Sequence, residues 1–334
     1  MGEGEGAIAI DGETIRRYEN AHYGIAGRHS AVQICGWTRK SLRGQGVCYK
    51  QKFYGIDCHR CAQMSPAFAF CQECCVHCWR PAEWMKKIKM GERETDPPQL
   101  IIDKIVEKRK LLVCGIGGAG DADRKRFDES FKKFPSHWAI SLSGEPTIYP
   151  KLGELIKLLR KNKEVRSIFL VTNGQEPQAL AALKRRKALP TQLYVSISAP
   201  CEELFKKLNR SVYRDGWKRL QKTLAMLKTL GCRTVVRLTL IRGVNDFDAH
   251  LREYATMLET SGPDFIEVKS YMHLGLSRER LERDNMAPHD YVKAWTRKLV
   301  AVIPSYRTED EDWASRIVLL KRKGSKFGNM IKNP

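Results

Sequence analysis

Residues 66–78 read PAFAFCQECCVHC. This stretch places three cysteines with three and then two residues between them: Cys71, Cys75 and Cys78. The apolar run before them predicts a buried strand over 66–70, so the cysteines would lie in the loop that follows that strand. Three thiolates on a tight loop can bind three irons of a [4Fe–4S] cluster and leave the fourth iron without a protein ligand. The alternative is a zinc ion, for which Cys74 or His77 would supply the fourth ligand.

Five further apolar runs follow at a steady interval, and helical patterns separate them. The runs cover residues 138–144, 167–174, 192–200, 233–243 and 264–272. Between them, apolar residues recur every three or four positions over 150–161 and 217–230, a spacing typical of amphipathic helices. Short buried strands that alternate with helices predict an α/β fold with a parallel sheet and right-handed crossovers. Six such units, rather than eight, indicate a TIM-like partial (β/α)6 barrel.

Polar residues gather where successive predicted strands end. In a barrel of this kind the carboxyl ends of the strands meet at one face and carry the chemistry. A polar residue can also simply end a strand, so the prediction depends on the joint placement of several. We therefore expect the cofactor to be bound by residues at these ends: Ser143, Gly144, Glu145, Thr172, Asn173, Ser196, Ser198 and Arg237.

A second set of three cysteines precedes the first, with twelve residues in each interval: Cys35, Cys48 and Cys61. Most of the 11 cysteines fall within residues 35–78, and the N-terminus lacks the basic and apolar segments of a secretion signal. Metal ligation is therefore favoured over a disulfide framework. We expect an auxiliary [4Fe–4S] cluster with one open iron, with structural zinc as the alternative.

The 334-residue chain carries 59 Lys and Arg against 38 Asp and Glu, a formal net charge of +21. This charge favours a polyanionic partner. Nucleic acid is preferred to a membrane, since no amphipathic basic helix stands out. No apolar run reaches the roughly 18–20 residues of a spanning helix. We expect a cytoplasmic protein in three segments: a lead-in and auxiliary-cluster region over 1–65, the barrel over 66–305, and a C-terminal segment over 306–334. The lysine-rich tail at 321–332 would either follow phosphates flexibly or be a solvated end.

The first cysteine motif and the barrel together resemble the radical S-adenosylmethionine (SAM) superfamily. The spacing of the three cysteines resembles its signature, and the run SGEP at 143–146 resembles its Gly-Gly-Glu motif. The resemblance implies that the open iron binds SAM and that the second motif holds the methionine amino group. Reduction would then cleave SAM to a 5′-deoxyadenosyl radical.

Longer runs resemble the tRNA 4-demethylwyosine synthase family. They include CYKQKFYGI at 48–56, SLSGEPTIYP at 141–150, QLYVSISA at 192–199, LTLIRGVND at 238–246 and SRERLERDNM at 277–286. The resemblance implies a radical SAM enzyme of the carbon–carbon lyase class, which condenses N1-methylguanosine beside the anticodon of tRNA-Phe with pyruvate. The radical would abstract a hydrogen from the N1-methyl group, and 4-demethylwyosine would enter wybutosine biosynthesis. We also expect a monomer with an external flavodoxin- or ferredoxin-like reductant.

Two sites could hold pyruvate in such an enzyme. The open iron of the auxiliary cluster could chelate the carboxylate and ketone oxygens. Alternatively, Lys50 could form a Schiff base, as the resemblance implies for the matching lysine, with Lys52 as the second choice. We favour chelation, since the auxiliary cluster would otherwise have no evident use, and keep Lys50 as the candidate catalytic residue.

The sequence defines the tRNA side less sharply. Arg39, Lys40 and Arg43 lie between the first two auxiliary cysteines. Trp37 and Tyr49 are candidate platforms for a flipped base, with core packing as the alternative. Two rival functions stay open: another radical SAM subclass with an auxiliary cluster, and a non-enzymatic zinc-dependent module that binds RNA.

Overall fold

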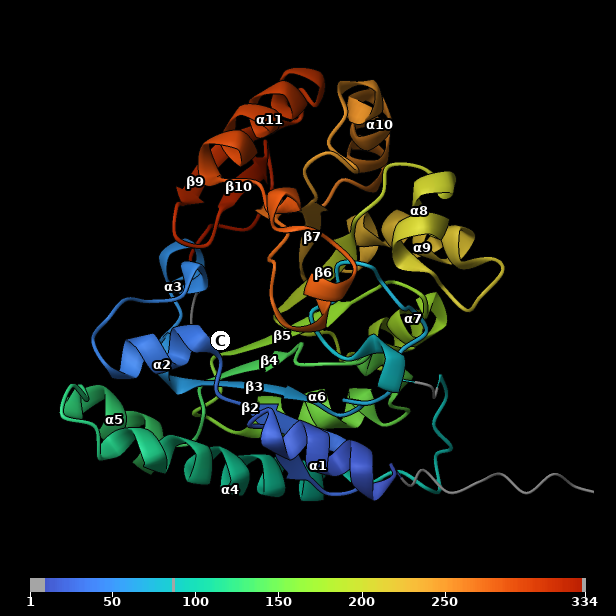
Figure 1. Cartoon of the computed structure of the whole chain (residues 1–334). Helices are drawn as coiled ribbons and strands as arrows, with labels where there is room; N and C mark the ends of the chain where they lie inside the picture. The colour runs from blue at the N-terminus through green and yellow to red at the C-terminus, as the bar shows by residue number, and fades with distance from the viewer. Residues whose placement is uncertain (1–9, 86–87, 332–334) are drawn as a thin grey trace, which may run out of the picture.

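The computed structural model describes residues 10–85 and 88–331, and its strands form one mixed sheet. The central strands run parallel and in chain order: β3 (Cys61–Ser65), β4 (His137–Ile140), β5 (Ser167–Thr172), β6 (Gln192–Ile197), β7 (Arg233–Leu240) and β8 (Phe265–Ser270). Antiparallel strands extend both edges: β2 (Ser30–Gln33) and β1 (Gly24–Ala26) beside β3, and β10 (Ile317–Arg322) and β9 (Tyr306–Asp312) beside β8. The six parallel strands confirm the predicted partial α/β barrel (Figure 1).

The crossover helices pack against the outer face of the sheet, as their apolar spacing predicts. In α6 (Leu152–Lys161), Leu155 and Ile156 are fully buried in the same core as Ile168 and Leu170 of β5. The other α-helices are α1 (Gly12–Asn20), α2 (Gly36–Leu42), α3 (Tyr49–Tyr54), α4 (Pro98–Gly117), α5 (Arg124–Lys132), α7 (Pro177–Arg185), α8 (Glu202–Asn209), α9 (Gly216–Met226), α10 (Leu251–Ser261) and α11 (His289–Val302). Short 3-10 turns include η1 (Cys58–Arg60) and η3 (Pro146–Ile148). Within the described ranges, no helix is both long and apolar enough to span a membrane.

The inner face of the sheet holds a separate apolar cluster, which we call the inner cluster. The helix α3 supplies Phe53 and Tyr54 to it, and both side chains are at most 1% exposed. Their partners are inward-facing residues of β5, β6, β7, β8 and β10: Phe169, Tyr194, Val235, Phe265, Ile317 and Leu319. The helix α3 packs on the inner face of the sheet and lies near the β9–β10 hairpin (Figure 1). The segment that carries Cys48 and Lys50 is therefore fixed to the barrel.

The prediction of a strand over 66–70 is wrong, because the first parallel strand is β3, which ends just before it. Pro66 has no N–H to donate to a neighbouring strand, and the chain turns at that point. The run is apolar because the turn is buried. Phe68 and Phe70 are fully buried, and Phe68 packs edge-on against Tyr18 of α1. The cysteine loop thus follows the first parallel strand after one buried turn.

Over its described part the C-terminal segment is neither a flexible nor a merely solvated tail. Its first half forms the β9–β10 hairpin, and Phe327 and Ile331 pack against the inner cluster. The amide of Ile331 donates to the carbonyl of Tyr54 (3.0 Å). Two apolar residues therefore anchor a segment that its charge alone describes as free. Lys332, the last residue of the predicted tail, lies outside the described residues.

Candidate active site

A cavity of about 300 Å³ opens at the carboxyl ends of the parallel strands. The cysteine loop and the ends of β4 to β8 form its walls. It is lined by Cys71, Cys75 and Cys78, which we call the first trio. Most of the predicted cofactor-binding residues also line it: Gly144, Glu145, Thr172, Asn173, Ser196, Ser198 and Arg237. The structure therefore brings the polar strand ends to one place, as the sequence predicts.

Ser143 is the exception, because its side chain supports the cysteine loop instead of lining the cavity. Its hydroxyl donates to the carbonyl of Phe68 (2.8 Å). The next residue, Gly144, has φ +68°, and a Cβ there would lie 1.9 Å from the carbonyl oxygen of Ala67. The amide of Glu145 then donates to the carbonyl of Phe70 (2.7 Å). Residues 143–145 thus dock the end of β4 directly onto the turn that begins the cysteine loop.

Glu145 holds two strand ends together. Its Oε1 accepts from the hydroxyl of Thr172 (2.8 Å) and from the amide of Thr147 (3.0 Å), and its Oε2 accepts from the amide of Asn173 (2.7 Å). Burial raises the pKa of the Glu145 carboxyl, and these donors act against that rise. The side chain of Asn173 in turn points at the sulfur of Cys71 (Nδ2–Sγ, 3.8 Å). The glutamate therefore fixes the cavity edge nearest the first cysteine.

Two cavity residues that sequence analysis missed, Glu73 and Asn209, form the floor beside the cysteine loop. Asn209 Nδ2 donates to Glu73 Oε2 (3.0 Å), and the hydroxyl of Ser198 donates to Asn209 Oδ1 (2.6 Å). Glu73 Oε1 and His77 Nδ1 are buried without a partner, although both residues line the cavity. Unpartnered buried polar atoms beside three thiols fit a site that a further polar group completes.

The second cysteine trio comes together from three elements. Cys35 precedes α2, Cys48 precedes α3, and Cys61 begins β3. Burial raises the pKa of both Cys48 and Cys61, to about 12 for Cys61, and the thiol of Cys35 adds to the rise in both. The thiols of Cys48 and Cys61 thus each lie within electrostatic reach of Cys35, despite the long intervals in the sequence.

Neither cysteine trio has the spacing that one metal ion needs. Among the described residues, Cys201, His250 and Glu253 form a group of three possible ligands whose ligand atoms all lie within 4.8 Å of one another. Neither cysteine trio forms such a group. A zinc ion with Zn–S bonds of about 2.3 Å would draw its sulfurs closer than that.

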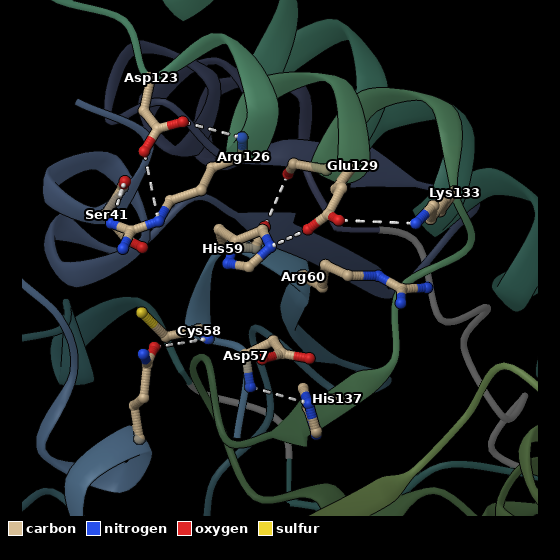
Figure 2. A network of polar contacts seen from close by, with 12 residues as sticks. Ser41, Asp57, Cys58, His59, Arg60, Asp123, Arg126, Glu129, Lys133 and His137 are labelled. Carbon is tan, nitrogen blue, oxygen red and sulfur yellow. Dashed lines mark hydrogen bonds and ion pairs between the residues drawn. The ribbon is translucent and has the colours of Figure 1, made fainter. Parts of the chain in front are cut away.

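Buried contacts fix the turn that leads into β3. Arg109, which is 1% exposed, donates from Nε to the carbonyl of Cys61 (3.0 Å) and from Nη2 to the carbonyl of His59 (2.8 Å). The imidazole of His59 points at Glu129 of α5 (2.8 Å), as Figure 2 shows. The position of Cys61 is therefore set by α4 and α5 as well as by the sheet.

Lys50 and Lys52 point to opposite sides of α3. Lys50 Nζ lies inside the sheet, 4.5 Å from the ring centroid of Phe169 and 4.6 Å from that of Tyr194. Burial lowers the pKa of Lys50, which favours the neutral and nucleophilic amine. Lys52 instead pairs with Asp310 of β9 (2.8 Å) and is about half exposed. Lys52 therefore lies away from the inner face that Lys50 occupies, because residues two apart on a helix do not share a face.

Sequence analysis also missed a carboxylate at the centre of the inner face. Glu267 of β8 is fully buried, and Arg237 donates to its Oε2 from Nε (2.9 Å) and Nη2 (2.7 Å). The hydroxyls of Tyr54 (2.7 Å), Tyr49 (3.2 Å) and Tyr194 (3.2 Å) also donate to this carboxylate. Burial alone would raise the pKa of Glu267, but Arg237 and the other donors hold that pKa below its usual value.

The sequence did carry a signal for this site. Within the run 264–272, alternate residues share one face of the strand, and Phe265, Glu267 and Lys269 all point inward. A period of two that places charged residues beside an aromatic one on a barrel interior indicates a polar site. Lys269, like Arg237, lines the cavity. These two cations thus connect the cavity with the surroundings of Lys50.

The candidate tRNA-contacting residues divide by exposure. Tyr49 is 6% exposed and bonded to Glu267, so core packing is its role and a stacking platform is excluded. Trp37 is partly exposed, and Lys40 Nζ lies 5.0 Å from its ring centroid. Arg39 and Arg43 are exposed on or next to α2.

Comparisons with known proteins agree with this geometry. Residues 65–255 match the model of the radical SAM superfamily, and residues 260–322 match the model for wyosine base formation. The chain is 42% identical to the S-adenosyl-L-methionine-dependent tRNA 4-demethylwyosine synthase of Pyrococcus abyssi, over 93% of this chain and 89% of that protein. Two solved structures are similar. One, described as TYW1 with a lysine–pyruvate adduct bound, has a TM-score of 0.82 at 36% identity and covers 94% of this chain and 96% of its own. The other, archaeal TYW1, has a TM-score of 0.76 at 33% identity and covers 96% and 99%.

Proposed function

Since the chain belongs to the tRNA 4-demethylwyosine synthase family of radical SAM enzymes, we propose that it joins pyruvate to N1-methylguanosine beside the anticodon of tRNA-Phe. Membership makes it a tRNA-modifying enzyme of wybutosine biosynthesis, and the superfamily uses SAM with a [4Fe–4S] cluster. The proposed product is 4-demethylwyosine. Because a pyruvate carbon–carbon bond breaks as the carboxyl group is lost, the enzyme would act as a carbon–carbon lyase.

We assign the SAM-binding cluster to the first trio and an auxiliary [4Fe–4S] cluster to the second. The cysteines Cys71, Cys75 and Cys78 would hold the first cluster, which would supply the one-electron chemistry needed to functionalise a methyl group that no side chain could deprotonate. The unpartnered atoms of Glu73 and His77 and the fixed strand ends support this placement. SAM would contact the polar strand ends that line the cavity: Gly144, Glu145, Thr172, Asn173, Ser196, Ser198 and Arg237.

The observation that carries the pyruvate assignment is the position of Lys50. Its amine lies on the inner side of the sheet, over the rings of Phe169 and Tyr194, and the charges of Arg237, Glu267, Cys48 and Cys61 all act on it. A related protein, with 36% identity, is described with a lysine–pyruvate adduct. We therefore now prefer Lys50 to chelation by the auxiliary cluster as the group that holds pyruvate. The neutral amine would add to the pyruvate C2 carbon, and water would leave as the imine forms.

Other parts of the proposal follow from charge and topology. The net charge of +21 and the exposed Arg39, Lys40 and Arg43 suit a tRNA phosphate backbone. We further propose a cytoplasmic monomer that takes electrons from an external flavodoxin- or ferredoxin-like protein. Its organisation would comprise the auxiliary-cluster region over 1–65, the barrel over 66–305 and a docked C-terminal segment over 306–334.

The test is an anaerobic assay with the reconstituted enzyme. A tRNA-Phe that carries N1-methylguanosine is incubated with SAM, dithionite and pyruvate, and the digested nucleosides are analysed by mass spectrometry. We expect 4-demethylwyosine with pyruvate and none without it. Formation of 5′-deoxyadenosine with no change in the nucleoside would overturn the proposed substrate pair.

A further inference from the structure

Two cations form a ledge between the cavity and Lys50, and we call Arg237 and Lys269 the cationic ledge. Both line the cavity, and both lie against the same ring: Lys269 Nζ is 5.8 Å and Arg237 Cζ is 5.9 Å from the ring centroid of Tyr49. Arg237 Cζ also lies 4.7 Å from the ring of Tyr194, which Lys50 Nζ contacts at 4.6 Å. The ledge therefore borders the cavity and also lies beside Lys50 across the ring of Tyr194.

Among the described residues, one cation of the ledge pairs directly with a carboxylate and the other does not. Arg237 is matched by Glu267, to which it donates twice. Lys269 donates to the backbone carbonyl of Ser315 (2.6 Å), and among the described residues no carboxylate lies within 4.0 Å of its Nζ. Burial, followed by Arg237, lowers the pKa of Lys269 to about 8, and the more distant carboxylates of Glu267 and Asp312 act against that lowering. A buried cation without a counter-charge is costly, and a bound anion would remove that cost.

We infer that Lys269, supported by Arg237, binds the carboxylate of the 2-oxo acid whose carbonyl carbon Lys50 holds. This inference rests on the proposed role of Lys50 and adds the group that distinguishes a 2-oxo acid from other carbonyl compounds. An ammonium that forms no ion pair suits the carboxylate of a monoanion. The rings of Phe169 and Tyr194 beside the amine leave an apolar side for a small substituent such as the methyl group of pyruvate.

The test compares two ketones on the reconstituted holoenzyme. Pyruvate and acetone both offer a methyl ketone, but only pyruvate has a carboxylate. Each is titrated with borohydride present, and the label on the Lys50 peptide is measured by mass spectrometry. In Lys269→Met the concentration of pyruvate for half-maximal labelling should rise about 10- to 100-fold, as expected when a charge-assisted hydrogen bond is lost. The value for acetone should not change, which also shows that the variant is folded.

Two further variants complete the design. Lys269→Arg keeps the charge and should retain most of the preference for pyruvate. Lys52→Met removes an outward lysine of α3, the helix that carries Lys50, and should change neither titration. Unchanged pyruvate labelling in Lys269→Met, or an equal shift for both ketones, would overturn the inference and leave Lys50 in place. If neither ketone labels Lys50 in the wild type, the proposed role of Lys50 fails, and the inference fails with it.

Discussion

Gly144→Ala should break the contact between the end of β4 and the cysteine loop. An added Cβ would lie 1.9 Å from the carbonyl oxygen of Ala67 and 2.6 Å from that of Phe70. Both neighbours are backbone atoms, so neither can rotate away as a flexible side chain would. The loop that carries Cys71 must therefore move by about 1 Å or more to restore normal contact distances.

The size of the effect follows from two contributions. A left-handed conformation costs a residue with a Cβ about 1–2 kcal/mol. Displacing the loop would also weaken the bonds from Ser143 to Phe68 (2.8 Å) and from Glu145 to Phe70 (2.7 Å), each worth about 1 kcal/mol. We expect a loss of about 3–4 kcal/mol in the free energy of unfolding, measured by denaturant titration.

Gly243→Ala is the matched control. Gly243 has φ +72°, close to that of Gly144, but no atom lies within 4 Å of its added Cβ. It should lose only the conformational part, about 1–2 kcal/mol, and keep its iron content and SAM cleavage. Gly144→Ala should lose both cluster binding and cleavage. Equal stability losses in the two variants, with iron retained in both, would refute the docking role of Gly144.

Three other predictions concern the cysteines, the inner cluster and the response to acid. Alanine at Cys71, Cys75 or Cys78 should abolish SAM cleavage. Alanine at Cys35, Cys48 or Cys61 should leave 5′-deoxyadenosine formation but abolish formation of the tricyclic nucleoside. Near wild-type amounts of that nucleoside from a variant of the second trio would contradict the two-cluster assignment. Phe53→Ala should lower the free energy of unfolding, measured by denaturant titration, by about 3–5 kcal/mol. The control Trp313→Ala, at an exposed residue, should lower it by about 0.5 kcal/mol or less. Similar losses in both variants would contradict the packing of α3 inside the sheet. His137 is buried and accepts from the amide of Asp57 (Figure 2). Burial lowers the pKa of His137 from 6.5 to about 4. Between pH 6.5 and 4 the imidazole is therefore protonated in the unfolded chain but neutral in the folded one. His137 alone should therefore lower the stability by about 3 kcal/mol between pH 6.5 and 4. His137→Asn should reduce the pH slope by that amount, which thermal unfolding of both proteins at several pH values will show.

The parallel strands and the first cavity could be predicted from the sequence because their signals are local. Apolar runs of strand length, helical spacing in 150–161 and cysteines a few residues apart each depend on neighbours in the chain. The polar residues at successive strand ends, such as Thr172 and Ser196, meet because parallel strands must end at the same edge.

The parts that could not be predicted depend on contacts between distant segments. Nothing near Tyr49 or Tyr54 in the sequence indicates that their hydroxyls meet Glu267 more than 200 residues later. The apolar run at 66–70 reads as a strand, since burial of a turn and burial of a strand demand the same residue types. Likewise, the charge of the final segment hides the anchoring by Phe327.

The most direct test of the account is to identify the residue that holds pyruvate. Reconstituted enzyme is incubated with 13C-labelled pyruvate, reduced with borohydride, digested and mapped by mass spectrometry, with Lys50→Arg and Lys52→Arg in parallel. The account predicts a labelled Lys50 in the wild type and in Lys52→Arg, and the loss of both label and 4-demethylwyosine in Lys50→Arg, because arginine keeps the charge but forms no stable imine. An enzyme that makes 4-demethylwyosine while Lys50 is replaced by arginine, or a wild type labelled only elsewhere, would contradict it.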